Sequence, residues 1–315
     1  MAAVWLHIYR TVMRRKILYM IMILLHAAGG RAQSHPALEN YLFNPVNISP
    51  SYSGRQSGSM SFSHDQQLVG IQGAPVTTSL NWDSMTKGRF GYNFSIMQNT
   101  VGPINNVAFG LSTAYHLRIS PTEYFSAGIR YSLNRLGIDL VSEQYIDPND
   151  VVIINGVIQK WYQNVDISGA YYGSRSYFGL TYRNAVRTSF FINENYGARV
   201  FHIFGGSEFP TRYGFDVLYS GLINVSENSP VDINTHLMAR YKQYISSGVL
   251  LSPNKVGLVY RINSTNGFTF LYQYAYPLTD IRYISQQSHT ACLRYHFRRA
   301  KVFGNRIVET PVFFL

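Results

Sequence analysis

The chain of 315 residues has one cysteine, Cys292, and few charged residues, which make up 14% of the sequence. One cysteine cannot form an internal disulfide. A lipoprotein would need a cysteine at its cleavage site near the N-terminus, and Cys292 is far from it, so a lipoprotein is excluded. Acidic side chains number 16 against 27 Lys and Arg, but five of the basic ones lie in the first 32 positions, which hold no acid. The remaining excess of basic residues is small, so a nucleic-acid partner has little support.

The sequence near the N-terminus lacks an apolar run long enough to span a membrane. The run Ile17–Leu25 has nine residues, whereas a spanning helix needs about 20. It follows a basic cluster at 14–16 and precedes small residues at 27–30, which is the order of a secretory signal. We therefore expect residues 1–32 to be a cleaved signal peptide rather than a retained anchor. A start at Met13 would give a signal of more ordinary length and stays an alternative.

Aromatic residues are abundant, at 15% of the chain, and many of them alternate with polar or small residues. In 89–97 the apolar residues occupy every second position, and the same period recurs near 107–117, 125–133, 178–182, 256–262 and 268–276. No helical stripe of comparable length competes with this period. In the final segment the outward residues are Ala291, Leu293, Tyr295 and Phe297, which leaves charged Arg294 on the other face. Polar inner faces and aromatic outer faces are typical of barrels in lipid.

Turn signals separate the apolar segments, at Gly102-Pro103, Ser120-Pro121, Asp147-Pro148-Asn149, Gly205-Gly206, Asn228-Ser229-Pro230, Ser252-Pro253-Asn254 and 263–267. Strands in a bilayer must close, because an open edge leaves backbone groups unpaired. At roughly 20 residues per strand and turn, the sequence predicts an all-β, antiparallel transmembrane outer-membrane barrel of about 14 strands, with 12 to 16 acceptable. We place the barrel at residues 56–297. A soluble sandwich or propeller stays possible, because period two alone does not show what the outer face meets.

The segment at 33–55, between signal and barrel, should be a fixed, non-helical lead-in. Pro45 and Pro50 lack backbone N–H groups and favour extended conformations in the residues before them, while Gly54 permits positive φ. One interpretation is that the segment closes the periplasmic end of the barrel or folds into its lumen as a plug. The other is that it docks a periplasmic partner, with candidate residues Tyr41, Phe43, Asn44, Pro45, Tyr52 and Gly54.

A basic tail, 298–315, follows the barrel. It contains Arg298, Arg299, Lys301 and Arg306, opposed by Glu309 alone. The tail is a solvated end by default, and the alternatives are an anchor to acidic surface groups or a second docking candidate for a partner. In an even-stranded barrel both termini face the periplasm, which is where we expect them. The segment Val151–Ile158 reads as an apolar hairpin around Asn155-Gly156, expected in an outer loop where it would suit a partner.

Catalytic and metal-binding patterns find little support. Histidines at 116, 202, 236, 289 and 296 are scattered singly, with no Gly-x-Ser-x-Gly elbow beside them. His-x-x-x-His and paired-cysteine spacings are absent from the sequence. We therefore expect no enzyme, no metal site and no cofactor.

Two motifs carry a resemblance to a known family. The run Tyr41-Leu42-Phe43-Asn44-Pro45, followed by Ser49–Gly54, resembles the opening of the PorP/SprF family of type IX secretion system outer-membrane proteins. The segment Gln67–Thr77, with Gly70, Gly73, Ala74 and Pro75, is similar to that family's Trp-Val-Gly-x-x-Gly-Ala-Pro-x-Thr element, and Ser288-His289 echoes its ending. Serines at 49, 51 and 53 and Leu68 depart from the usual residues.

The resemblance implies a non-enzymatic outer-membrane component of protein secretion, gliding motility or both, in bacteria of the Bacteroidetes type. The implied partners are periplasmic type IX components, including an OmpA-like peptidoglycan-binding lipoprotein, secreted proteins with C-terminal sorting domains, and outer-membrane lipid. A channel or transporter for small solutes or hydrophobic compounds is the alternative, because about 14 strands can enclose a polar lumen. A lumen packed by the lead-in and by Arg89, Arg130, Arg183, Arg261 and Arg294 would favour the first function, and a continuous water path the second.

Overall fold

A computed structural model describes residues 41–297, apart from 56–57, 87–88, 140–156, 190–196, 212–213, 228, 243, 284 and 286. The predicted signal peptide with its alternative start at Met13, the first part of the lead-in and the basic tail lie outside the described residues. The Asn155-Gly156 turn also lies outside them, while Val157 and Ile158 begin a strand.

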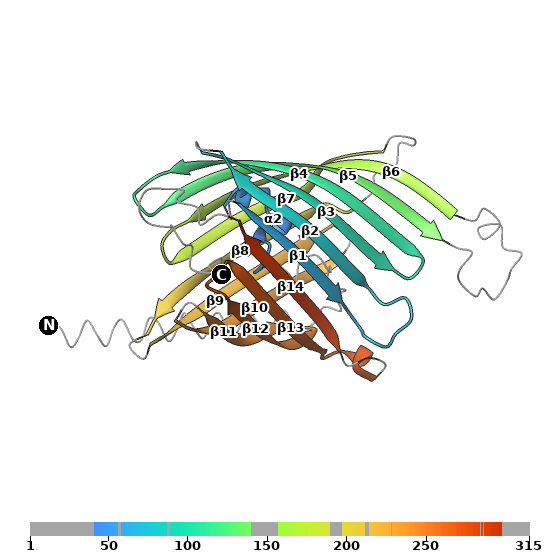
Figure 1. Cartoon of the computed structure of the whole chain (residues 1–315). Coiled ribbons are helices and arrows are strands. Elements are labelled where there is room, and N and C mark those ends of the chain that lie inside the picture. Colours follow the sequence, from blue (N-terminus) through green and yellow to red (C-terminus); the bar gives the residue numbers. More distant parts are fainter. Residues whose placement is uncertain are drawn as a thin grey trace, which may run out of the picture.

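Fourteen antiparallel strands close into one barrel, in which each strand pairs with its neighbours in sequence and the first pairs with the last (Figure 1). The predicted fold class and strand number are confirmed. The strands are β1 (Ser59–Gln66), β2 (Val76–Met85), β3 (Phe90–Val101), β4 (Ile104–Arg118), β5 (Tyr124–Asp139), β6 (Val157–Tyr172), β7 (Ser176–Ser189), β8 (Val200–Pro210), β9 (Phe215–Ser226), β10 (Ser229–Tyr241), β11 (Ile245–Ser252), β12 (Lys255–Asn263), β13 (Phe268–Pro277) and β14 (Ser288–His296).

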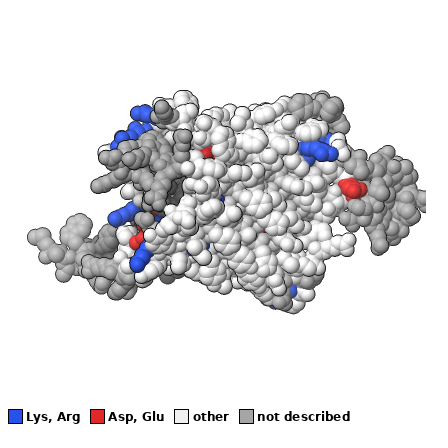
Figure 2. Space-filling model, in the orientation of Figure 1, with Lys and Arg blue, Asp and Glu red and all other residues white. Residues whose placement is uncertain are grey.

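The alternation of side chains divides the wall into an apolar outer face and a polar inner face. In β4, Leu111 and Tyr115 are exposed, whereas Ser112 and His116 are buried. The described wall seen in Figure 2 is almost free of Lys, Arg, Asp and Glu, which gather toward its two ends. A single closed sheet has no second sheet to cover its outer face, so the sandwich and propeller alternatives are wrong. An exposed apolar wall of this kind is suited to lipid.

Among the described residues, most predicted turns connect strands as expected, but Gly205-Gly206 does not; the predicted turn Asp147-Pro148-Asn149 lies outside the described residues. Both glycines lie inside β8, paired with Phe178 and Tyr177 of β7. A Cβ added at Gly206 would lie 2.6 Å from the ring of Tyr177. The glycine signal therefore marks crowding by an aromatic neighbour rather than a turn.

The two ends of the barrel differ in their connections. The end at which β1 begins, here called the plug end, carries the turns at 86–89, 119–123, 173–175, 211–214, 242–244 and 264–267. The opposite end, here called the loop end, carries connections that include 67–75, 140–156 and 278–287, with the short 3-10 helix η4 (Asp280–Tyr283) in the last of these.

Two short helices lie inside the barrel, where Figure 1 shows them in blue behind the strands of the wall. They are α2 (Pro45–Ile48) and the 3-10 helix η3 (Pro50–Tyr52), so the prediction of a non-helical lead-in is wrong. Each begins with a proline, whose fixed φ suits the first helical position and whose missing N–H is not needed there. Each is closed by one backbone bond, from Ser49 N to Pro45 O and from Ser53 N to Pro50 O, at 2.9 and 3.0 Å.

Candidate functional site: a plug in the barrel lumen

The lead-in folds into the lumen as a compact plug, which we define as residues Tyr41–Gly54. Its aromatic side chains are enclosed by the wall, with 0%, 3% and 1% of Tyr41, Phe43 and Tyr52 exposed. Of the two interpretations of this segment, a plug and a docking segment, the structure shows the plug. In this conformation these side chains are not available as a docking surface, and the docking hypothesis stays a prediction.

An aromatic cluster holds the C-terminal part of the plug. The ring of Tyr52 lies 5.7 Å from that of Phe204 and 6.0 Å from that of Tyr172, between centroids. Tyr172 in turn stacks on Tyr124 at 5.5 Å, and the Arg55 guanidinium lies 4.5 Å from the Tyr172 centroid. Aromatic pairs at such distances add to the stabilisation gained from their buried area.

Tyr41 anchors the N-terminal part of the plug on the far wall. Its hydroxyl lies 2.6 Å from Ser220 Oγ on β9 and 3.2 Å from His236 Nδ1 on β10. Burial raises the pKa of Tyr41 well above its ordinary value, and burial does the same to the pKa of Tyr52. Both phenols are therefore neutral at physiological pH, as an enclosed hydroxyl must be to avoid a buried charge.

Side chains of the wall donate to backbone carbonyls of the plug. Arg130 on β5 donates to the carbonyls of Val46 and Asn47, the second at 3.0 Å. Ser126 donates to the Ser51 carbonyl at 2.6 Å. Buried carbonyls that are not part of a regular ladder need such partners, because an unsatisfied group costs about 1–3 kcal/mol.

His116 on β4 satisfies a fourth group of the plug. Its Nε2 lies 2.7 Å from the Ser53 carbonyl oxygen, which can only accept, so the ring proton belongs on Nε2. The other nitrogen, Nδ1, then accepts from the Tyr172 hydroxyl at 2.6 Å. The histidine thus ties the plug to the aromatic cluster, and this use of both nitrogens is structural.

Asn44 links the plug to the seam where the barrel closes. Its Oδ1 accepts from Ser61 Oγ on β1 at 2.8 Å and from Arg294 Nη2 on β14 at 2.7 Å. At the other end of the plug, Gly54 N donates to Asp83 Oδ1 on β2 at 2.8 Å. Both ends of the plug are therefore held by the wall.

Two glycines on the inner wall let the plug backbone approach closely. A Cβ added at Gly91 would overlap the Ser53 carbonyl, and one added at Gly128 would overlap the peptide between Pro50 and Ser51. Any larger residue at either position would need the plug to move. The wall is therefore shaped to the backbone of this segment.

The arginines predicted to fill the lumen do so in part. Arg130, Arg261 and Arg294 are buried on the inner wall, with 6%, 1% and 1% exposed. Arg130 also lies 3.5 Å from Asp166 Oδ2 in an ion pair. Arg183 is half-buried, and Arg89 is exposed in the turn before β3, so its prediction as a lumen residue is wrong.

Residues 30–295 match the family described as type IX secretion system membrane protein PorP/SprF. The chain belongs to the PorP/SprF family. The resemblance first noted in its motifs is thereby confirmed. Family and closed barrel together make this an outer-membrane β-barrel protein of type IX secretion. No curated protein matches the chain.

Solved structures with a similar arrangement of strands are distant in sequence. A TodX ΔS2S3 mutant monoaromatic hydrocarbon channel has 7% identity and a TM-score of 0.49, over 85% of this chain and 97% of that one. The Ralstonia pickettii toluene transporter TbuX has 10% identity and a TM-score of 0.45, over 86% and 96%. The KdgM porin has 10% identity and a TM-score of 0.39, over 76% and 99%. None of these likenesses bears on what this PorP/SprF chain binds or transports.

The family motifs lie at opposite ends of the barrel. The opening motif forms the plug, while Gly70, Gly73, Ala74 and Pro75 lie in the β1–β2 loop at the loop end. That loop is fixed to the start of β14, through Val69 N to Gln287 O at 2.8 Å and Leu68 N to Ser288 Oγ at 3.2 Å. Gly102 N, in the β3–β4 turn, donates to the Gly73 carbonyl at 2.8 Å. His289 faces outward and lies 2.5 Å from the Tyr272 hydroxyl through its Nδ1.

Sequence reasoning missed most of the wall residues that hold the plug. Of the predicted docking candidates, Tyr41, Phe43, Asn44, Pro45, Tyr52 and Gly54 form the plug, whereas Arg298, Arg299, Lys301 and Arg306 lie outside the described residues. Strand alternation assigns His116, Ser126 and Gly128 to the inner face, but it gives no signal of contact with the plug.

Within the described part of the chain, no helix is long and apolar enough to cross a membrane.

Proposed function

We propose that this protein is a non-enzymatic outer-membrane hub of type IX secretion, gliding motility or both, which works through protein contacts rather than by conducting solutes. The observation that carries the proposal is the plug, whose backbone is hydrogen-bonded by the wall on several sides. A channel would need a continuous water path where Tyr41, Tyr52 and Phe204 are now packed. The plugged lumen therefore supports the hub over the channel.

The polarity of the barrel suggests where partners act. In an even-stranded outer-membrane barrel, both chain ends and the short turns face the periplasm, and the longer loops face outward. By this rule the plug end faces the periplasm, and the loop end with its Gly70–Pro75 motif faces the exterior. We propose that a periplasmic OmpA-like lipoprotein binds at the plug end, and that secreted proteins with C-terminal sorting domains are captured at the loop end.

The basic tail and the plug are the first candidates for the periplasmic contact. The plug side chains named as candidates are buried, so a partner that touched them would have to draw the plug out. The tail begins after Phe297, at the plug end, and its four basic side chains are opposed by Glu309 alone. We therefore propose the tail as the primary contact and the plug as a segment that a partner reaches only after displacement.

The experiment is a pull-down of the tagged full-length mature protein from its own outer membrane in mild detergent, with the partners identified by mass spectrometry. Recovery of periplasmic type IX components, above all an OmpA-like lipoprotein, is the expected result. A barrel with its tail neutralised at Arg298, Arg299, Lys301 and Arg306 is the matched comparison. A clean barrel without partners from the native membrane would contradict the hub.

A further inference from the structure

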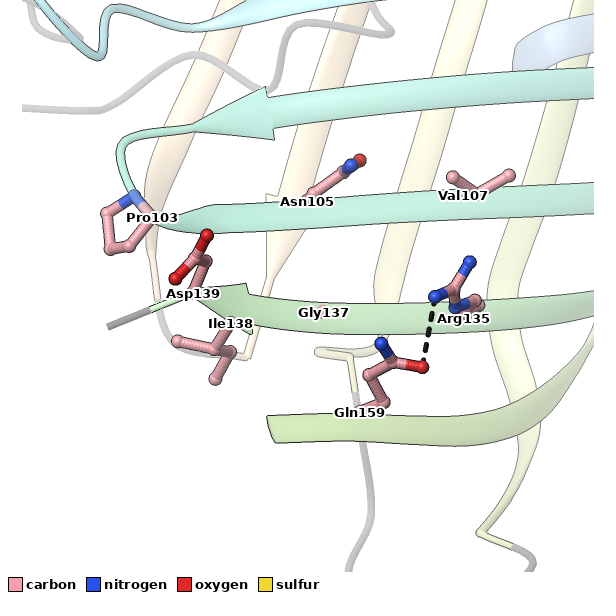
Figure 3. Close-up of a pocket in the computed structure, with 8 residues that line it drawn as sticks. All are labelled: Pro103, Asn105, Val107, Arg135, Gly137, Ile138, Asp139 and Gln159. Carbon is pink, nitrogen blue, oxygen red and sulfur yellow. Dashed lines mark hydrogen bonds between the residues drawn. The ribbon is translucent and has the colours of Figure 1, made fainter. Parts of the chain in front are cut away.

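A pocket lies on the outer face of the barrel, near the loop end, where β4, β5 and β6 run side by side (Figure 3). Its lining consists of Pro103, Asn105, Val107, Arg135, Gly137, Ile138, Asp139 and Gln159. The alternation of β5 places Arg135 on the same outward face as exposed Ile129 and Tyr131. The pocket therefore opens away from the lumen and has no part in holding the plug.

Arg135 stands where the outer face changes from apolar to polar. The outward residues of β5 are apolar or aromatic from Phe125 to Leu133, apart from the small Ala127, and are polar or glycine from Arg135 to Asp139. Across the ladder, Arg135 pairs with Val107 on one side and with Trp161 on the other. Tryptophan and arginine at the edge of an apolar belt mark the level of lipid headgroups.

The guanidinium of Arg135 has donors to spare. It donates to Gln159 Oε1 at 2.9 Å, as the dashed line in Figure 3 shows. Arginine has five N–H donors in a planar fork that fits the oxygens of a phosphate. Asp139 lines the same pocket four residues further along the strand and bounds the space available to an anion on that side.

Space beside the guanidinium is provided by Gly137. A Cβ added there would meet only the Asn105 carbonyl, at 3.6 Å, so the groove between β4 and β6 is open next to Arg135. Apolar side chains continue below it on the wall, at Val107 and Leu133. A ligand with a phosphate group at Arg135 could thus lay an acyl chain against the apolar belt.

We propose that this pocket is a binding site for one phosphate-bearing lipid of the outer membrane, with the phosphate on Arg135 and an acyl chain on the wall of β4–β6. The argument for lipid over a free anion is the continuity of the pocket with the lipid-facing belt. Charge-assisted hydrogen bonds supply the selectivity for phosphate. The site does not depend on the proposed secretion role, because it uses none of the plug residues.

The test uses purified, delipidated full-length mature protein incubated with phosphatidylglycerol, and native mass spectrometry to count lipids retained as detergent is removed. Wild-type protein should retain one phosphatidylglycerol, and R135Q should retain it about tenfold less, in line with the loss of a charge-assisted contact. Diacylglycerol, which lacks the phosphate, should not be retained. The matched control is R118Q, because Arg118 lies at the plug end and donates to the carbonyls of Ser120 and Pro121.

A second variant tests the pocket without removing charge. G137L fills the open groove while Arg135 stays, and it should also lower retention, whereas heat modifiability in gels should match wild type for all three variants. Equal retention by wild type and R135Q would overturn the proposal. Displacement of the lipid by excess inorganic phosphate would overturn the assignment to lipid, and equal retention of diacylglycerol would overturn the role of the phosphate.

Discussion

Gly91 on the inner wall and Ser53 in the plug lie in backbone contact, so close that a Cβ at Gly91 would overlap the Ser53 carbonyl. Gly91 belongs to the third strand and Ser53 to the segment ahead of the barrel. The Ser53 carbonyl is also the acceptor for His116. A contact of this kind needs both a small wall residue and a plug of fixed shape. It makes the plug part of the folded barrel rather than a loose leader.

The ion pair that underlies the plug is predicted to matter for stability. Arg130 donates to two plug carbonyls and to Ser112 Oγ, and it pairs with buried Asp166. R130Q would leave the Asp166 charge without this partner, so we expect a loss of about 3–5 kcal/mol in the free energy of unfolding. Urea unfolding in detergent, followed by tryptophan fluorescence, measures it. The control is R187Q, which breaks the more exposed pair with Glu227 and should cost about 1 kcal/mol or less.

Alkaline pH is predicted to loosen the plug. Burial holds the pKa of Tyr41 and of Tyr52 well above the ordinary value of 10.0. A phenol released from the lumen would ionise near that ordinary value, so the stabilisation from burying it is complete below pH 10 and declines as the pH rises beyond it. Tyrosinate absorbance should therefore show fewer ionising groups between pH 10 and 11 in the intact protein than in the unfolded chain. If Tyr41→Phe and Tyr52→Phe left that difference unchanged, the assignment to the plug would fail.

The outer face is predicted to tolerate charge according to depth. Leu111 lies in the middle of β4 with its side chain on the apolar outer face, where it is 61% exposed. L111R should cost about 2–4 kcal/mol if that wall meets the bilayer midplane, whereas N105R at the edge should cost about 0–1 kcal/mol. Equilibrium folding into phosphatidylcholine vesicles gives both values. Equal costs at the two positions would contradict the placement of the belt.

The docking hypothesis is tested by truncating the buried aromatics of the plug. Tyr41→Ala with Phe43→Ala removes the anchor on Ser220 and its neighbour, while the strand ladder around them is untouched. If a partner draws the plug out and then contacts these two side chains, capture of periplasmic partners should weaken while the barrel remains heat-modifiable. Phe62→Ala on the outer face, where the side chain is 48% exposed, is the control and should leave capture unchanged. Equal loss of partner capture and of heat modifiability would contradict the hypothesis, because the barrel itself would then be disrupted.

Individual residues show which parts of the fold and of the plug site could be predicted from the sequence. Alternation assigned Arg294 to the inner face and Leu293 to the outer face correctly, because a side-chain period of two follows directly from strand geometry. The same rule could not tell that Arg294 would meet Asn44, since that contact joins residues 250 positions apart. Gly205-Gly206 misled because glycine serves close packing as well as turns. The plug itself was one of the open interpretations, and local proline chemistry could not decide between a lumen and a surface.

Single-channel conductance would show whether the plug seals the lumen. The full-length mature protein and a variant lacking the plug, Tyr41–Gly54, would be inserted into planar lipid bilayers and recorded as single channels, after both have been shown to be heat-modifiable. We expect a silent wild-type barrel and a conducting variant, because the deleted segment is what fills the lumen. Steady conductance from the wild-type barrel, equal to that of the variant, would contradict a sealed lumen and favour the channel.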